Sequence, residues 1–141
     1  MATVTSKLVS GTNYKVEAQA GGFTLVSDQD QSVGGNGTGP SPKDFLLAAI
    51  GACTIQTIRM VAAKRKWDVQ EMSVTVTISE IDDPSKPAGS NAKITLIEEL
   101  IEVKGNLSQA ELDAIEKTAG RCPVLKIITE PKLVQKRTVK V

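Results

Sequence analysis

The sequence predicts one domain that combines strands with helices, the pattern of an α+β protein. Residues 1–27 and 67–104 contain stretches in which apolar and polar side chains alternate, as in strands with one buried face. Residues 42–66 form a long apolar run that is typical of a buried helix. A chain of 141 residues can bury one core, and its scarcity of aromatic residues means that Val, Ile, Leu, Ala and Met must build it.

The first 27 residues predict a meander of three strands. Their segments TVTSKLV, YKVEAQA and FTLVSD are separated by the turn-forming stretches SGTN and GG. In YKVEAQA the alternation places Tyr14, Val16, Ala18 and Ala20 on one face and the polar residues on the other. Residues 28–41 follow as a loop, because they are rich in Gly, Asn, Ser and Pro.

A helix is expected over residues 42–66. Ser41 is a suitable N-cap, Pro42 suits the first helical position, and Asp44 in the first turn complements the helix dipole. The basic run KRK at 64–66 suits the last turn. Such a helix would be ~36 Å long and apolar on nearly all sides, so other parts of the fold or a second subunit must cover it.

The remaining residues predict a hairpin, two helices and a strand. Two apolar stretches flank the loop DDPSKPAGSN and form the hairpin over 67–104. Helices are expected over 108–129: Ser108 and Glu111 have the spacing of a capping box, Gly120 suits a helix end, and Cys122 and Pro123 begin a second short helix. The segment KLVQKRTVKV predicts a final strand over 132–141.

Charge and composition exclude several classes of function. The net charge is +1 and the two signs are interleaved, so neither nucleic acid nor an anionic membrane surface is an expected partner. The N-terminus lacks the apolar run of a signal peptide, and no stretch is expected to approach the roughly 18 apolar residues of a membrane span. These features predict a cytoplasmic protein. With two cysteines and no histidine, no metal site and no cofactor are expected.

Three polar motifs carry little functional signal. The segment GGNGTGP lacks the Lys-Ser/Thr ending of a phosphate-binding P-loop. Asp28 and Asp30 are candidates for acid chemistry or metal binding, but their composition favours a solvated loop. The KRK run is interpreted as an ordinary helix end.

The two cysteines are the principal candidate site. Cys122 is expected at a helix N-terminus directly after Arg121, so the helix dipole and a cation would both lower its thiol pKa. Cys53 lies within the long helix, where no neighbour in the sequence activates it. Each cysteine could be a buried small hydrophobe. Alternatively the two form a redox dithiol, which requires Cα atoms about 4.4–6.8 Å apart.

The segments GPSPKDFLLAAIGAC and RCPV, together with the apolar helix after the first, resemble the OsmC/Ohr superfamily of thiol-dependent peroxidases. The resemblance extends over the whole chain in the order of its elements and indicates a divergent branch. It implies an α+β fold in which two chains intertwine as a homodimer, with long cysteine-bearing helices at the centre and antiparallel sheets outside. The partner subunit would then cover the apolar helix.

The resemblance also implies chemical roles for both thiols. Cys53 matches the peroxidatic cysteine, which becomes a sulfenic acid, and Cys122 matches the resolving cysteine, which closes a disulfide. A cellular dithiol would reduce that disulfide, and the apolar surroundings of Cys53 favour a small hydrophobic peroxide. Two alternatives are a non-catalytic protein that binds a small hydrophobic ligand in the dimer cleft, and a stress sensor whose thiols oxidise without turnover.

The chain departs from the superfamily in its basic residues. Well-studied members use an arginine near the N-terminus, held by a carboxylate, to stabilise the thiolate. No arginine precedes Arg59, and Lys7 or Lys15 could substitute only as point charges. Asp44 lies where the carboxylate is expected, but about 13 Å along the helix axis from Cys53. Asp44 would therefore act on Cys53 through a bridging residue.

Overall fold

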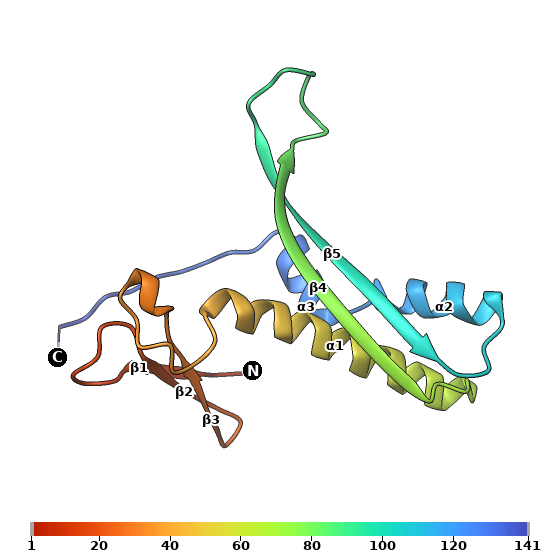
Figure 1. Ribbon diagram of the computed structural model, residues 1–141, viewed down its shortest axis with the longest axis horizontal. Helices are drawn as coiled ribbons and strands as arrows, with labels where there is room; N and C mark the ends of the chain where they lie inside the picture. The colour runs from red at the N-terminus through yellow and green to blue at the C-terminus, as the bar shows by residue number, and fades with distance from the viewer. Residues whose placement is uncertain (1, 141) are drawn as a thin grey trace. The chain divides into compact units, whose positions relative to one another are not determined.

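The computed structural model describes residues 2–140, which form two compact units that divide between Ala48 and Ala49 (Figure 1). The predicted α+β composition is confirmed: antiparallel strands are combined with helices in one chain. In chain order the elements are β1 (Thr5–Leu8), β2 (Val16–Ala20), β3 (Phe23–Ser27), the 3₁₀ helix η1 (Gln31–Val33), α1 (Pro42–Arg65), β4 (Glu71–Asp82), β5 (Lys93–Lys104), α2 (Gln109–Ala119) and α3 (Pro123–Thr129).

In the first unit, β1, β2 and β3 form an antiparallel sheet in that order. Leu8 pairs with Val16 and Ala20 pairs with Phe23. The β2–β3 turn consists of Gly21 and Gly22, whose φ angles of 57° and 86° lie in the region that favours glycine. Along β2 the side chains alternate between half-buried and exposed, as the sequence pattern predicts.

The loop after β3 is built around Asp28, whose side chain is only 2% exposed. Its carboxylate accepts hydrogen bonds from the N–H groups of Gln29 (2.8 Å), Asn36 (3.2 Å) and Thr38 (3.1 Å), and from the Thr38 hydroxyl (2.8 Å). These donors satisfy the carboxylate and allow it to be buried. For Asp28 the expectation of a solvated loop residue is therefore wrong.

Glycines in this loop permit close backbone contacts. A Cβ on Gly35 would lie 1.9 Å from the Gln29 carbonyl oxygen, and one on Gly39 would lie 2.7 Å from that of Val26. Two of the loop N–H groups already bind the Asp28 carboxylate. The glycine-rich run therefore organises the loop around an internal anion.

Helix α1 begins where the capping residues predict. The Ser41 carbonyl accepts from the Phe45 N–H at 3.2 Å, and the Ser41 hydroxyl accepts from the Asp44 N–H at 3.3 Å. The helix is long and apolar enough to cross a membrane by length and composition, with a mean hydropathy of 1.7 in one window of 18 residues. The expectation that no segment approaches this length is corrected, because α1 has 24 residues and no charged side chain from Phe45 to Ile58. A core helix of a soluble protein has the same properties.

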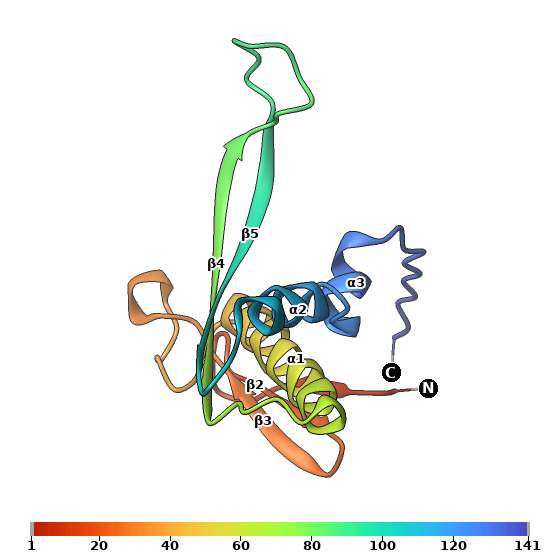
Figure 2. The same cartoon turned by 90° about the vertical axis from the view of Figure 1, so that its right-hand side faces the viewer.

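In the second unit, β4 and β5 form a long antiparallel hairpin whose register runs from Glu71 opposite Lys104 to Asp82 opposite Lys93. Both of these end pairs form exposed ion pairs, at 2.9 Å and 2.5 Å. The hairpin tip projects away from α2 and α3 (Figures 1 and 2). A two-stranded sheet is not stable alone. The hairpin must therefore be stabilised where its base packs against the rest of the unit.

The core of the second unit lies where α1, α2 and the base of the hairpin meet. Its buried members are Ile58 and Ala62 of α1, Val69, and Ile115 and Ala119 of α2. Residues of both strands pack against this cluster, namely Met72, Ile101 and Val103. Burial of these apolar side chains holds the two helices to the sheet.

Helix α1 meets β4 closely at Gly51. A Cβ at this position would lie 3.4 Å from the Val76 Cγ2 atom and 3.6 Å from the Val74 carbonyl oxygen. The absence of a side chain at Gly51 thus sets the spacing between the helix and the strand.

Helices α2 and α3 begin at capping residues that the sequence predicts. Ser108 forms a capping box with Glu111: its hydroxyl accepts from the Glu111 N–H at 3.3 Å, and its own N–H donates to Glu111 Oε2 at 2.8 Å. Cys122 is the N-cap of α3, and its Sγ accepts from the Leu125 N–H at 3.5 Å.

The predicted final strand over 132–141 is not formed in residues 132–140, and residue 141 lies outside the described part. In the described chain this segment has no neighbouring strand to bind its N–H and C=O groups. Its apolar side chains are exposed: Leu133 by 86%, Val134 by 74% and Val139 by 61%.

Candidate active site

The second unit brings Cys53 and Cys122 together. Cys53 projects from α1, and Cys122 lies at the start of α3. Their sulfurs are within hydrogen-bonding reach of each other, and both are free thiols. Cys122 is completely buried, whereas Cys53 is partly exposed. A small molecule can therefore reach Cys53 more easily than Cys122.

The pKa of the Cys53 thiol is raised above its ordinary value. Burial is the main cause, and the neighbouring Cys122 thiol adds to it as a hydrogen-bond partner and as a nearby charge. The neighbouring Val124 N–H and Thr57 hydroxyl oppose the rise in the Cys53 pKa without reversing it.

The pKa of the Cys122 thiol is lowered, even though burial alone would raise it. The hydrogen bond from the Leu125 N–H, together with the influence of the neighbouring Cys53 thiol, Thr54 hydroxyl and Val124 N–H, outweighs burial. The position at a helix N-terminus therefore favours the thiolate, as the sequence predicts. Arg121, the second predicted cause, has an exposed side chain.

Two residues that the sequence analysis did not single out connect Cys122 to the sheet. The Thr54 side chain is fully buried, and its hydroxyl donates a 2.6 Å hydrogen bond to Oε1 of Glu99 on β5. Glu99 lies in the inward row of β5 between Ile97 and Ile101. A charged residue within an apolar row of a strand is the signal that could have identified it.

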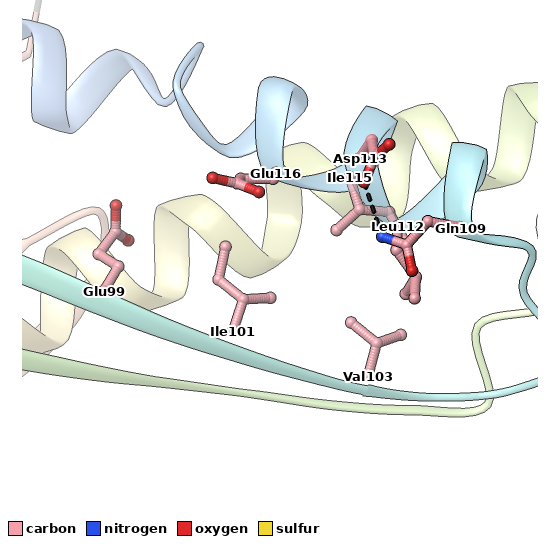
Figure 3. A pocket seen from close by; sticks show the side chains of 8 residues that line it. All are labelled: Glu99, Ile101, Val103, Gln109, Leu112, Asp113, Ile115 and Glu116. Carbon is pink, nitrogen blue, oxygen red and sulfur yellow. Dashed lines mark hydrogen bonds between the residues drawn. The ribbon is translucent and has the colours of Figure 1, made fainter.

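Glu99 also lies at one end of a surface hollow of about 310 Å³ between β5 and α2 (Figure 3). The hollow has an apolar part and a polar part, and its lining residues are Glu99, Ile101, Val103, Gln109, Leu112, Asp113, Ile115 and Glu116. Gln109 Nε2 donates to Asp113 Oδ1 at 2.8 Å across one turn of α2. Glu99 therefore links the buried Thr54 to a hollow that opens to the surface.

Asp44, the third predicted site residue, belongs to the first unit and caps the start of α1. Its Oδ2 accepts from the Ser41 N–H (2.9 Å) and hydroxyl (2.7 Å), and these hydrogen bonds lower its pKa. Its catalytic role stays a prediction. Arg59 donates to the Val69 carbonyl at 2.8 Å and so fixes the chain after α1. Within residues 2–140 no cluster of three or more Cys, Asp or Glu side chains could hold a metal ion.

The family model described as OsmC-like protein matches residues 34–135, a segment that contains both cysteines. The chain belongs to the OsmC-like protein family. No curated protein matches it significantly.

Solved structures share the fold of this OsmC-like chain. An organic hydroperoxide resistance protein OsmC of Legionella pneumophila is 26% identical, with a TM-score of 0.63 over 91% of this chain and 90% of that one. An OsmC-like protein of Mycoplasma pneumoniae is 19% identical, with a TM-score of 0.71 over 92% and 88%. An organic hydroperoxide resistance protein of Elizabethkingia anophelis is 20% identical, with a TM-score of 0.63 over 92% and 90%.

Proposed function

We propose that this OsmC-like protein is a thiol peroxidase that reduces organic hydroperoxides with Cys53 and Cys122. The observation that carries the proposal is the contact between a partly exposed thiol and a fully buried thiol of lowered pKa. The names of the Legionella and Elizabethkingia structures, both organic hydroperoxide resistance proteins, support the same substrate class.

Cys53 is the attacking residue because a peroxide can reach its sulfur. The Cys122 thiolate lies within hydrogen-bonding reach and takes the Cys53 proton. The Cys53 thiolate then attacks the terminal oxygen of the hydroperoxide, and the O–O bond breaks. The alkoxide takes a proton from water and leaves as an alcohol, while Cys53 becomes a sulfenic acid.

Cys122 then resolves the sulfenic acid. Its sulfur attacks the Cys53 sulfur, the S–O bond breaks, and the departing hydroxide takes the proton that Cys122 received from Cys53 and leaves as water. The product is a Cys53–Cys122 disulfide. Two electrons and two protons from an external dithiol restore the two thiols, and the low pKa of Cys122 makes it a good leaving group in that reduction. A reducing cytoplasm, the predicted location, supplies such dithiols.

The active form is a homodimer. Helix α1 buries one stripe, Ile50, Thr54, Ile58 and Ala62, within its own unit. A second stripe remains exposed at helical spacing; it contains the small and apolar residues Ala49, Ala52, Met60 and Ala63, and the polar Gln56 at its middle. Small residues let helices approach closely, and an apolar stripe of this kind is stabilised by a partner helix. The same contact would enclose the peroxide site in apolar surroundings that favour an organic substrate.

Steady-state turnover tests this function. The wild-type protein, Cys53→Ser and Cys122→Ser are each mixed with an organic hydroperoxide and a dithiol reductant, and peroxide loss is followed. We expect turnover only in the wild type, with Cys53→Ser at the rate of the protein-free control. Equal peroxide loss in the wild type and in Cys53→Ser would contradict the proposal. Retention of a hydrophobic ligand by both proteins would then support the binding function instead.

A further inference from the structure

The Thr54 hydroxyl lies between two groups that both accept hydrogen bonds. Its oxygen is 2.6 Å from Oε1 of Glu99 and also within hydrogen-bonding reach of the Cys122 sulfur. The side chain is fully buried, so water does not compete for it. A hydroxyl has one proton to donate and two lone pairs. Thr54 can therefore donate to the carboxylate or to the sulfur, but not to both.

The 2.6 Å distance assigns the Thr54 proton to Glu99 while Glu99 is ionised. Hydrogen bonds from a hydroxyl to a carboxylate have this short length and are stronger than bonds between neutral groups. In that state Thr54 presents only a lone pair to Cys122 and does not stabilise a negative charge on the sulfur. Thr54 can donate to a Cys122 thiolate only when Glu99 does not hold its proton.

We propose that Glu99, acting through Thr54, shifts negative charge from the Cys122 sulfur towards the Cys53 sulfur. With Glu99 ionised, Thr54 is withheld from Cys122, so the Cys122 thiolate takes the Cys53 proton more readily. Cys53 has two donors that do not depend on Glu99, the Thr57 hydroxyl and the Val124 N–H. Thr54 and Glu99 are thus positioning residues, and the proposal rests on the proposed peroxidase function, in which Cys53 must be the attacking thiol.

This arrangement reconciles the acidity of Cys122 with the attacking role of Cys53. Thr54 is one of the groups that favour a Cys122 thiolate. Glu99 removes it from this role by accepting the proton of its hydroxyl. The other charged groups nearby are Asp113 and Glu116 of α2, which line the same hollow as Glu99, and the exposed Arg121.

The test is a pH titration of the reduced protein in the Cys53→Ser background, where Cys122 is the only thiol. The ultraviolet absorbance of the thiolate reports its ionisation. Glu99→Gln keeps the shape but weakens the acceptor and removes the charge, so Thr54 can donate to the sulfur. We expect the Cys122 titration midpoint to fall by about one pH unit, which is about tenfold more thiolate at a fixed pH below both midpoints. A midpoint that is unchanged or higher would overturn the proposal.

A double-mutant cycle separates the role of Thr54 from the direct effect of charge. Thr54→Val removes the hydroxyl with little change of shape, so the effect of Glu99→Gln should largely disappear in that background. It should persist in Thr54→Ser, which keeps a hydroxyl. An effect of equal size in Thr54→Val would show that Glu99 acts without Thr54 and would overturn the proposal.

The matched control is Glu98→Gln, because Glu98 neighbours Glu99 on β5 but is exposed. We expect this variant to leave the titration midpoint unchanged, and circular dichroism checks that each variant is folded. No peroxide enters the titration. Its outcome is therefore independent of the turnover assay, and the failure of either proposal can be recognised separately.

Discussion

The sulfur of Cys53 lies within hydrogen-bonding reach of the sulfur of Cys122, and this contact joins the long helix α1 to the first turn of α3. The two thiols therefore do not ionise independently. Ionisation of Cys122 opposes that of Cys53, because a negative charge beside a thiol raises its pKa. Which sulfur carries the negative charge therefore decides which thiol can attack a peroxide.

The reaction should stop at a defined intermediate in Cys122→Ser. Without the resolving thiol, Cys53 is expected to form a sulfenic acid that persists long enough to react with a carbon nucleophile such as dimedone. Mass spectrometry would locate the adduct on Cys53. Treatment of Cys53→Ser in parallel should give no comparable adduct on the buried Cys122. Rapid adduct formation on Cys122 would show that Cys122, and not Cys53, is the attacking thiol.

The buried Asp28 should stabilise the first unit in a pH-dependent way. Burial would raise the pKa of its carboxyl, but hydrogen bonds from the Thr38 hydroxyl and three backbone N–H groups lower it. A lowered folded-state pKa gives stability that is fully present above the unfolded pKa and is lost as the pH falls through the folded pKa. In Asp28→Asn the amide NH₂ is itself a donor and faces the groups that donate to the carboxylate in the wild type. This variant should therefore have a lower melting temperature than the wild type at neutral pH.

Thermal unfolding over a range of pH values tests this role of Asp28. The difference between wild type and Asp28→Asn should shrink as the pH falls through the folded-state pKa of Asp28. Asp30→Asn is the control, because Asp30 is exposed and accepts one backbone bond, from Ser32 at 2.8 Å. If Asp30→Asn lowers the melting temperature as much as Asp28→Asn does, burial of Asp28 is not the cause of the effect.

Substitutions at Gly51 should separate helix propensity from packing. Gly51→Ala adds a Cβ at 3.4 Å from Val76 Cγ2, the near limit of ordinary contact, and Ala favours a helix over Gly by about 1 kcal/mol. We expect it to be neutral or stabilising in chemical denaturation. Gly51→Leu should be destabilising, by roughly 1–3 kcal/mol, because the larger side chain pushes α1 away from β4. Equal stability of the two variants would contradict the close contact.

The exposed stripe on α1 should mediate self-association. Light scattering coupled to size-exclusion chromatography is expected to give the mass of a dimer for the wild type. Ala52→Glu places a charge in the middle of the stripe and should shift the mass towards a monomer, because burying an unpaired charge is costly. Lys66→Glu, at the exposed end beyond the helix, should leave the dimer intact. A monomeric wild type would rule out the dimer.

The sequence predicted elements that depend on local signals. Ser41, Ser108 and Cys122 mark helix starts through side-chain hydrogen bonds to nearby N–H groups, and such bonds need only a few consecutive residues. The lowered pKa of Cys122 follows from the same local geometry. The final strand over 132–141 was wrong for residues 132–140, because a strand needs a partner that local sequence does not supply.

Tertiary contacts explain what the sequence did not predict. Burial of Asp28 depends on a loop that folds back over ten residues, and composition does not show which carboxylate it encloses. The bond between Thr54 and Glu99 joins positions 45 residues apart. The only sign of this bond in the sequence is one charged residue, Glu99, in an apolar row of β5. The sequence does not show which helix faces that row, so it does not identify the partner of Glu99.

The most direct test of the central claim is to treat the reduced wild-type protein with one equivalent of an organic hydroperoxide and map the cysteine peptides by mass spectrometry. We expect rapid formation of an intramolecular Cys53–Cys122 disulfide, with Cys122→Ser unable to form it. If both thiols stay reduced while a known peroxidase in parallel reacts fully, the two cysteines are not a peroxide-reducing pair.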